Sequence, residues 1–180
     1  MNPQSEESQE SKSQASRPAV AIVGATGAVG RELLLCLERR RFPLSRLRLF
    51  ASARSAGRAL PFAGNELPVE ALDEDSFAGI DIALFSAGSA TSRRFAPAAR
   101  RHGAIVIDNS SAFRMDAAAP LVIPEVNAAA ALAHDGIIAN PNCVAIIAMM
   151  PLWPVHRQNR IRRIVLALSL IHISEPTRPY

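Results

Sequence analysis

Short apolar runs alternate with helical patterns along most of this chain. The run from Ala19 to Val23 is continuous and ends at a glycine, as is typical of a strand buried in a parallel sheet. Leucines at helical spacing follow it up to Arg41, and Pro43 ends that helix. Further strands are expected at 47–51, 67–72 (a short edge strand), 80–85, 104–107 and 137–139, and further helices at 91–102 and 143–155. Because each crossover helix must cover a sheet face, this alternation predicts an α/β fold with a doubly wound parallel sheet.

The two ends of the chain differ from this middle part. Residues 1–17 are mostly Ser, Gln and Glu with hardly an apolar side chain, so they are expected to form a disordered tail. The segment 160–168 is expected to be a strand that begins a new unit. We therefore expect a first domain over 18–142, and a helix with one strand of a second domain over 143–168.

Composition limits the possible locations and scaffolds. Hydrophobic residues make up 49% of the chain, which excludes a wholly disordered protein. No apolar run approaches the roughly 20 residues of a membrane helix, and the polar, acidic start does not resemble a secretory signal, so a cytoplasmic location without membrane contact is expected. Cys36 and Cys143 are too few for a disulfide scaffold or a four-ligand zinc site, and no metal site is expected.

The charged residues exclude several kinds of chemistry. The net charge is +4, yet Lys12 is the only lysine, so the chain has no lysine for a P-loop and none outside the expected tail for Schiff-base catalysis. The only tyrosine is Tyr180, which excludes the Tyr-x-x-x-Lys pair of short-chain dehydrogenases. With one Trp and one Tyr to stack on bases, a nucleic-acid surface is not expected.

A glycine motif separates the first strand from the first helix. It consists of Gly24, Ala25, Thr26, Gly27, Ala28, Val29 and Gly30. The first glycine permits a tight turn, the second lets a phosphate approach the backbone, and the third lets helix and strand pack closely. Together with the free amides of the helix start, this pattern predicts a Rossmann-type dinucleotide-binding domain. The alternative is an ordinary strand–helix connection.

The end of the second strand indicates which dinucleotide is bound. NAD-binding domains usually carry an acidic residue there, which holds the ribose 2′-hydroxyl. Here the segment holds Ser52, Arg54 and Ser55 and no acid, and a guanidinium between hydroxyls suits a 2′-phosphate. NADP is therefore the expected cofactor, and the alternative for this segment is an exposed polar loop.

Two further side chains are candidates for chemistry. Cys143 follows Asn-Pro-Asn and opens an apolar helix, whose N-terminus favours the nucleophilic thiolate. Beside a nicotinamide, such a thiolate adds to an aldehyde and, after hydride loss, forms an acyl-thioester; the alternative is a core cysteine, as expected for Cys36 among its leucines. Arg114 follows the carboxyl end of a strand, where it is suited to a phosphate or carboxylate, or it is a solvated loop arginine.

Taken together, these segments resemble aspartate-semialdehyde dehydrogenases from about Val20 to about Val165. The shared segments, in the family's order, are the glycine motif, Ser52 to Gly57, Asp108 to Met115, Pro124 to Asn127, and Asn140 to Cys143. The resemblance implies NADPH-dependent reduction of aspartyl-4-phosphate to the semialdehyde with release of phosphate, a step toward lysine, methionine and threonine. It also implies a homodimer.

The resemblance also implies roles for single residues. Cys143 would be the acyl-thioester nucleophile, Asn142 would hold the substrate, and Arg114 would bind its phosphate. Thr26 to Val29 would hold the pyrophosphate, Arg54 with Ser55 would hold the 2′-phosphate, and Gly88 would belong to a cofactor loop.

The sequence departs from the family's pattern in three places. The family usually continues after its cysteine with Ser-Thr, where this chain has Val144 and Ala145, and Gly88-Ser89 replaces a usual Gly-Gly. After Val165 the family continues with Ser-Thr-Tyr-Gln and a substrate domain that carries a catalytic histidine. Residues 169–180 instead resemble a translated sequencing adapter, so we expect a natural protein about twice as long and an inactive 180-residue chain.

Two other functions remain open from the sequence. One is the related reductase of N-acetylglutamyl phosphate, which usually has a tyrosine in its glycine loop. The other is a catalytically silent relative that binds nucleotide, which the loss of two hydroxyls at Val144 and Ala145 suggests.

Overall fold

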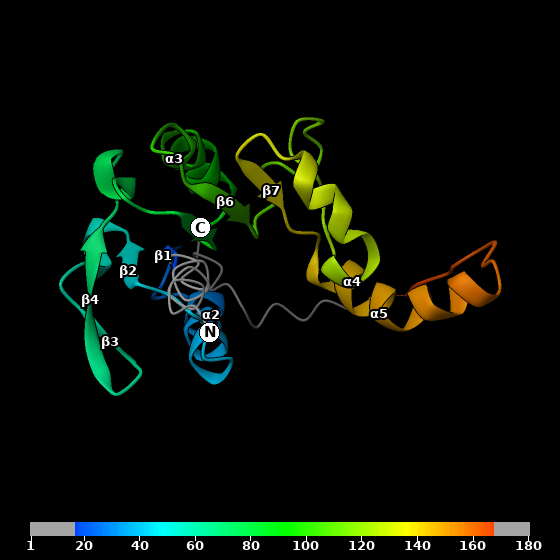
Figure 1. The fold of residues 1–180 in the computed structure, drawn as a ribbon, viewed down its shortest axis with the longest axis horizontal. Helices are drawn as coiled ribbons and strands as arrows, with labels where there is room; N and C mark the ends of the chain where they lie inside the picture. Colours follow the sequence, from blue (N-terminus) through cyan, green and yellow to red (C-terminus); the bar gives the residue numbers. More distant parts are fainter. Residues whose placement is uncertain (1–16, 168–180) are drawn as a thin grey trace, which may run out of the picture.

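The computed structural model describes residues 17–167. The expected tail, apart from Arg17, and the terminal segment 169–180 lie outside the described residues. The chain between them forms one mixed sheet with helices on both faces (Figure 1).

The sheet has seven strands in the order β3-β4-β2-β1-β5-β6-β7. Their bounds are β1 Ala19–Val23, β2 Arg46–Ala51, β3 Ala59–Phe62, β4 Asn65–Ala71, β5 Ile82–Phe85, β6 Ile105–Asp108 and β7 Ile137–Ala139. All neighbours pair in parallel except β3 and β4. The chain leaves β1 in one direction to β2 and returns to its other side at β5, so the strand order reverses between these two neighbours. The expected doubly wound parallel sheet is confirmed.

Two long helices cover opposite faces of this sheet (Figure 1). Helix α2, Ala28–Arg39, contributes Leu34 to a cluster with the β1 and β2 residues Ile22 and Leu49. Helix α3, Ser89–Arg101, contributes Phe95 and several alanines to a second cluster, which contains Phe50 and Phe85. Because both faces are covered, all five residues of β1 are buried, which explains its uninterrupted apolar sequence.

One strand was missed and one was misplaced by the sequence pattern. The expected edge strand at 67–72 is β4, which lies inside the sheet, because β3 pairs with it in an antiparallel hairpin. The hairpin turn is Ala63-Gly64, and both residues have positive φ, 49° and 78°. That combination is typical of the tight type I′ turn, so Ala63-Gly64 was the signal for the missing strand.

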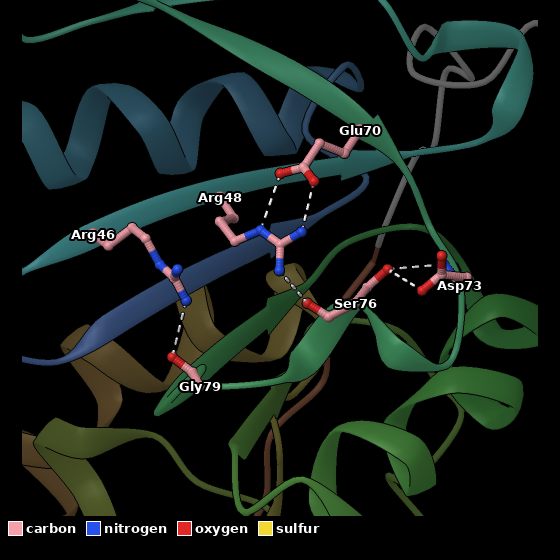
Figure 2. A network of polar contacts seen from close by, with 6 residues as sticks. All are labelled: Arg46, Arg48, Glu70, Asp73, Ser76 and Gly79. Carbon is pink, nitrogen blue, oxygen red and sulfur yellow. Dashed lines mark hydrogen bonds and ion pairs between the residues drawn. The ribbon is translucent and has the colours of Figure 1, made fainter.

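A polar network joins β2 and β4 to the short 3₁₀ helix η2, Asp75–Phe77 (Figure 2). Arg48 Nε and Nη2 donate to the two carboxylate oxygens of Glu70 at 3.0 and 2.6 Å. Arg48 Nη1 donates to the Ser76 carbonyl at 2.8 Å, and the guanidinium lies 4.7 Å from the centroid of the Phe50 ring. The hydrogen bonds from Arg48 hold the pKa of the Glu70 carboxyl below its ordinary value.

The last described part of the chain projects from the sheet (Figure 1). Helix α4, Pro124–Asn127, and the 3₁₀ helix η3, Ala128–Ala133, precede β7, and the long helix α5, Cys143–Gln158, follows it. No residue of α5 is buried, although the helix is strongly apolar. The expected strand at 160–168 is not formed over its described residues, 160–167, because no strand lies beside them to complete a hydrogen-bond ladder.

Candidate nucleotide and thiol site

The reversal of strand order creates a large cavity at one edge of the sheet. It encloses about 940 Å³ at the carboxyl ends of β1, β2 and β5, which is where open α/β sheets bind ligands. Of the residues expected in the site, its walls contain Gly24, Thr26, Gly27, Ala28, Val29, Ser52, Gly88 and Arg114. The structure therefore brings most of the expected cofactor loop and the candidate phosphate arginine to one cavity.

The first glycine makes the turn from β1 into the cavity wall. Gly24 has a φ of 89°, and a Cβ atom there would lie 2.6 Å from the carbonyl oxygen of Ser86 in the loop after β5. Gly27 N donates to the Gly24 carbonyl at 3.0 Å, which closes the loop. A larger residue at Gly24 would therefore separate the loops after β1 and β5, which together form this end of the site.

The start of α2 offers a place for an anion. The helix begins after Gly27, which has no capping side chain, and its first intrahelical bond runs from Arg31 N to the Gly27 carbonyl. The amides of Ala28, Val29 and Gly30 therefore have no carbonyl of a preceding turn to bind. These amides and the helix dipole fit a pyrophosphate, and two of the three residues line the cavity.

The segment after β2 is only partly in the cavity wall. Ser52 lines the cavity, whereas Arg54 and Ser55 lie in the 3₁₀ helix η1, Ala53–Ser55, outside the wall. Arg54 is exposed. The structure thus brings one hydroxyl of the expected 2′-phosphate site to the cavity, without the expected guanidinium.

Helix α3 contributes residues that the sequence pattern missed. Gly88, with a φ of 83°, is its N-cap, and Thr91, Arg94 and Phe95 line the cavity from its first turns. Their spacing of three and four residues puts them on one helix face. This spacing is visible in the sequence, but it identifies site residues only once the strand order is known. The pairing of β1 with β5 is what brings α3 to the glycine loop.

A buried carboxylate orders the loop after β6. Asp108 is fully buried and accepts hydrogen bonds from Ser92 Oγ at 2.6 Å, Ser110 Oγ at 2.7 Å and Ser110 N at 3.2 Å. The loop residues Asn109 and Ser111 line the cavity. Because the carboxylate binds both α3 and this loop, it holds the loop at the cavity wall.

Arg114 connects this cavity to the segment that precedes the thiol. Its Nε donates to the Asn140 carbonyl and its Nη2 to the Asn109 carbonyl, each at 3.0 Å. Asn140 Nδ2 also donates to Asn109 Oδ1 at 2.6 Å. The segment from Asn140 to Cys143 is thereby attached to the cavity wall, and Nη1 of Arg114 takes no part in these contacts.

Cys143 is the first residue of α5. The side chain of Asn142 caps this helix, since its Oδ1 accepts from Val144 N at 2.9 Å. The thiol is exposed, and its sulfur lies 3.9 Å from the same oxygen. Asn142 and Cys143 do not line the cavity.

Cys36 is exposed as well, on the outer side of α2, so its expected burial is wrong: the leucines beside it lie on the helix face that packs on the sheet.

Neither a metal-binding cluster nor a membrane-spanning helix is found in the part of the chain that the structure describes. Within residues 17–167, no group of three or more His, Cys, Asp or Glu residues is arranged to hold a metal ion. Over the same range, no helix combines the length and the apolar character that crossing a membrane requires.

Comparison with known proteins identifies the family. The aspartate-semialdehyde dehydrogenases of Synechocystis sp. and Bacillus subtilis are 53% and 50% identical over 148 residues, which are 82% of this chain but 44% and 43% of those proteins. A crystal structure of aspartate semialdehyde dehydrogenase II from Vibrio cholerae, complexed with ASA, matches with a TM-score of 0.76 and 44% identity over 79% of this chain and 47% of that one. The chain thus spans less than half the length of these relatives. The family pattern described as semialdehyde dehydrogenase, NAD binding domain, matches residues 19–134, and the chain therefore belongs to this family.

Proposed function

We propose that this chain is the NADP-binding part of an aspartate-semialdehyde dehydrogenase. The complete enzyme reduces aspartyl-4-phosphate to aspartate semialdehyde and releases phosphate, in the cytoplasm, as a homodimer that serves lysine, methionine and threonine synthesis. The relatives at 53% and 50% identity carry this enzyme's name, which favours it over the N-acetylglutamyl-phosphate reductase. Because the chain spans less than half of their length, activity is expected only from a longer polypeptide.

The observation that carries this proposal is the double contact of Arg114. Arg114 lines the cavity, and its Nε donates to the carbonyl of Asn140, three residues before the thiol. A dinucleotide site, an anion-binding side chain and a nucleophile are thus connected by one short hydrogen-bonded path. This is the combination that reductive cleavage of an acyl phosphate requires.

The residues of this chain would act as follows. The Cys143 thiolate attacks the acyl carbon, the bond to phosphate breaks, and an acyl-thioester remains on the sulfur. Arg114 binds the departing phosphate through donors such as Nη1, which the two carbonyls do not occupy. Asn142 caps α5 through its hydrogen bond from Val144 N and so holds the first turn, which carries the nucleophile. When bound, the nicotinamide supplies the hydride that reduces the thioester.

The residues present fit a dinucleotide. Gly24 and Gly30 leave no room for a Cβ atom, which keeps the loop close to the helix start, and the amides of Ala28 and Val29 there would meet an anion. No acidic residue is found among the residues that line the cavity, which favours NADP over NAD. The amides at the start of α2 would bind the pyrophosphate, and Ser52 would contact the adenosine end.

A catalytically silent relative is the second candidate. It rests on Val144 and Ala145, which lack the hydroxyls usual in the family. The hydrogen bond that caps α5 uses the backbone N–H of Val144. The cap therefore does not depend on a side-chain hydroxyl at position 144. The retained contacts of Arg114 and Asn142 favour the enzyme.

The test has two parts. The 180-residue chain is titrated with NADPH by calorimetry, and phosphate-dependent NADPH formation from aspartate semialdehyde is measured on the full-length protein that contains it. We expect binding by the chain, turnover by the full-length protein, and loss of turnover in Cys143→Ser with binding retained. Turnover of N-acetylglutamate semialdehyde instead of aspartate semialdehyde, or full activity in Cys143→Ser, would contradict the proposal.

A further inference from the structure

The two strand ends that hold Arg114 are joined by a pair of asparagine side chains. Asn109 follows β6 and Asn140 follows β7, and they are the next pair in the parallel register after Asp108 and Ala139. Asn140 Nδ2 donates to Asn109 Oδ1 at 2.6 Å. Both residues are half-buried, so this hydrogen bond is partly shielded from water, where an amide contact is electrostatically stronger.

The sheet does not need this side-chain bridge to close. Each parallel pair of strands ends with a backbone bond from the residue that follows a strand, as in Ser86 N to the Val23 carbonyl and Asn140 N to the Asp108 carbonyl, both at 2.8 Å. Within residues 17–167, only the end of β6 and β7 also has a hydrogen bond between the side chains of the pair next in register. The bridge is thus additional to the bonds of the sheet, and it lies where a guanidinium is bound.

The two bridged residues occupy one edge of the Arg114 guanidinium. Nε donates to the Asn140 carbonyl and Nη2 to the Asn109 carbonyl, each at 3.0 Å. The same two nitrogens of Arg48 bind both carboxylate oxygens of Glu70, as expected for N–H groups on one edge of a planar fork. The next edge of Arg114, formed by Nη1 and the second N–H of Nη2, makes no hydrogen bond in the part of the chain that the structure describes. Two parallel N–H groups suit two oxygens of one phosphate.

The direction of this free edge depends on the relative position of the two carbonyls. Asn109 is fixed to the body of the sheet, since its N–H donates to the Phe85 carbonyl at 2.9 Å. A shift of Asn140 against Asn109 would turn the guanidinium plane and the free edge with it. We propose that Asn140 is a positioning residue, which through its bridge to Asn109 directs the free edge of Arg114 toward the phosphate. This inference rests on the proposed dehydrogenase function and deepens it.

The test separates phosphate binding from the other steps of the reaction. In the full-length protein, phosphate-dependent NADPH formation from aspartate semialdehyde is measured for the parent, Asn140→Ala, Asn109→Ala and the double variant. We expect Asn140→Ala to raise the KM for phosphate about tenfold, while kcat and the KM for aspartate semialdehyde change less than about threefold. Because the two side chains form one bridge, the double variant is expected to match the single variants rather than to multiply their effects.

A second readout needs neither cofactor nor turnover. Phosphate bound beside the thiol is expected to slow the alkylation of Cys143 by iodoacetamide. The phosphate concentration that gives half of this protection should rise about tenfold in Asn140→Ala, in parallel with the KM. A loss of stability alone would not produce this parallel.

Asn127→Ala is the matched control. Asn127 accepts from Ile123 N at 2.8 Å and donates to the Leu121 carbonyl at 2.9 Å, and Leu121 forms a bridge with Ala139, the residue before Asn140. Asn127 does not line the cavity. The control therefore loses an amide that is bonded close to the end of β7. It is expected to be less stable in urea, with the KM for phosphate within about twofold of the parent value.

Other outcomes have defined meanings. Equal rises in the KM for phosphate and for aspartate semialdehyde, or multiplied effects in the double variant, would overturn the inference, because the bridge would not be the cause. If Asn140→Ala does not fold, as judged by circular dichroism, Asn109→Ala tests the same bridge from its other end. A parent protein without turnover would refute the proposed function and this inference with it. Turnover with an unchanged KM for phosphate in Asn140→Ala would refute this inference alone.

Discussion

A Cβ atom on Gly30 would lie 2.2 Å from the carbonyl oxygen of Gly24. The atoms in the way are backbone, so no side-chain rotation relieves the overlap. Helix α2 is therefore held directly against the end of β1, and this close packing sets the helix start at the cavity. Gly30 therefore contributes to ligand binding indirectly, because it allows the close packing that places the start of α2 at the cavity.

Gly30→Ala is expected to lower the free energy of unfolding by about 2–3 kcal/mol, because backbone must move to admit the methyl group. Urea unfolding followed by circular dichroism measures this. Gly27→Ala is the matched control, since its Cβ would lie 3.3 Å from the Gly24 carbonyl oxygen, a contact that a small shift relieves. The control is expected to weaken NADPH binding with a smaller loss of stability. Equal stability losses in the two variants would contradict this account.

The ion pair of Arg48 and Glu70 predicts a pH dependence of stability. The pKa of the Glu70 carboxyl is lowered on folding, so its contribution is present above its unfolded pKa and is lost as pH falls through the folded value. Glu70 is partly exposed, and the loss in Glu70→Gln at pH 7 is therefore expected to be about 0.5–1 kcal/mol. The difference between parent and variant should shrink below about pH 4.

Urea unfolding of both proteins at pH 7 and at about pH 3 tests this expectation. Glu66→Gln is the control, because Glu66 lies on the same strand, is exposed and forms no ion pair among residues 17–167. A loss in Glu70→Gln that is the same at both pH values would show that the pair is not the cause.

The hydrogen bond from Ser92 to the buried Asp108 predicts a coupling of stability and binding. Ser92→Ala removes a 2.6 Å bond from a fully buried carboxylate, and is expected to cost about 1–3 kcal/mol in unfolding free energy. Because Asp108 also holds the loop with Asn109, NADPH affinity should fall too. Ser111→Ala is the control for stability alone, because it removes only an exposed contact between the Ser89 and Ser111 hydroxyls, although Ser111 lines the cavity. Unchanged stability in Ser92→Ala would overturn the assigned role of Asp108.

The two exposed cysteines form an internal comparison of reactivity. Cys36 lies in the middle of α2, whereas Cys143 is the first residue of α5 and the nucleophile of the proposed reaction. Iodoacetamide at pH 7 is expected to alkylate Cys143 about tenfold faster than Cys36, as followed by peptide mass spectrometry. The variants Cys36→Ser and Cys143→Ser confirm which site reacts. Equal rates would favour the silent relative over the enzyme.

Prediction from the sequence was most successful where the pattern is local. The run from Ala19 to Val23 specifies a buried strand, and the glycines that follow it specify a helix start. The structure contains both, in β1 and at the start of α2. The hairpin of β3 was missed because its signal, Ala63-Gly64, is weaker than an Asn-Gly turn. The prediction of β4 as an edge strand was wrong for the same reason, since the missed β3 is the strand that covers its outer edge.

Prediction from the sequence was least successful where the outcome depends on distant segments. Cys36 lies among leucines in the sequence, but its direction on α2 points away from the sheet. The segment 160–167 has the composition of a strand, yet a strand forms only with a neighbour to share its hydrogen bonds. Burial and pairing are relations between segments, so a local pattern does not determine them.

The sequence by itself determined the fold class, the glycine loop and the candidate nucleophile, because apolar period, turn chemistry and helix starts are properties of neighbouring residues. Only the tertiary structure decided which residues share the cavity. It brought Arg94 from α3 into the wall and left Arg54 outside, since the order of β2, β1 and β5 determines which loops meet at one edge. It likewise attached Asn140 to Arg114, because the two meet only when β6 and β7 pair.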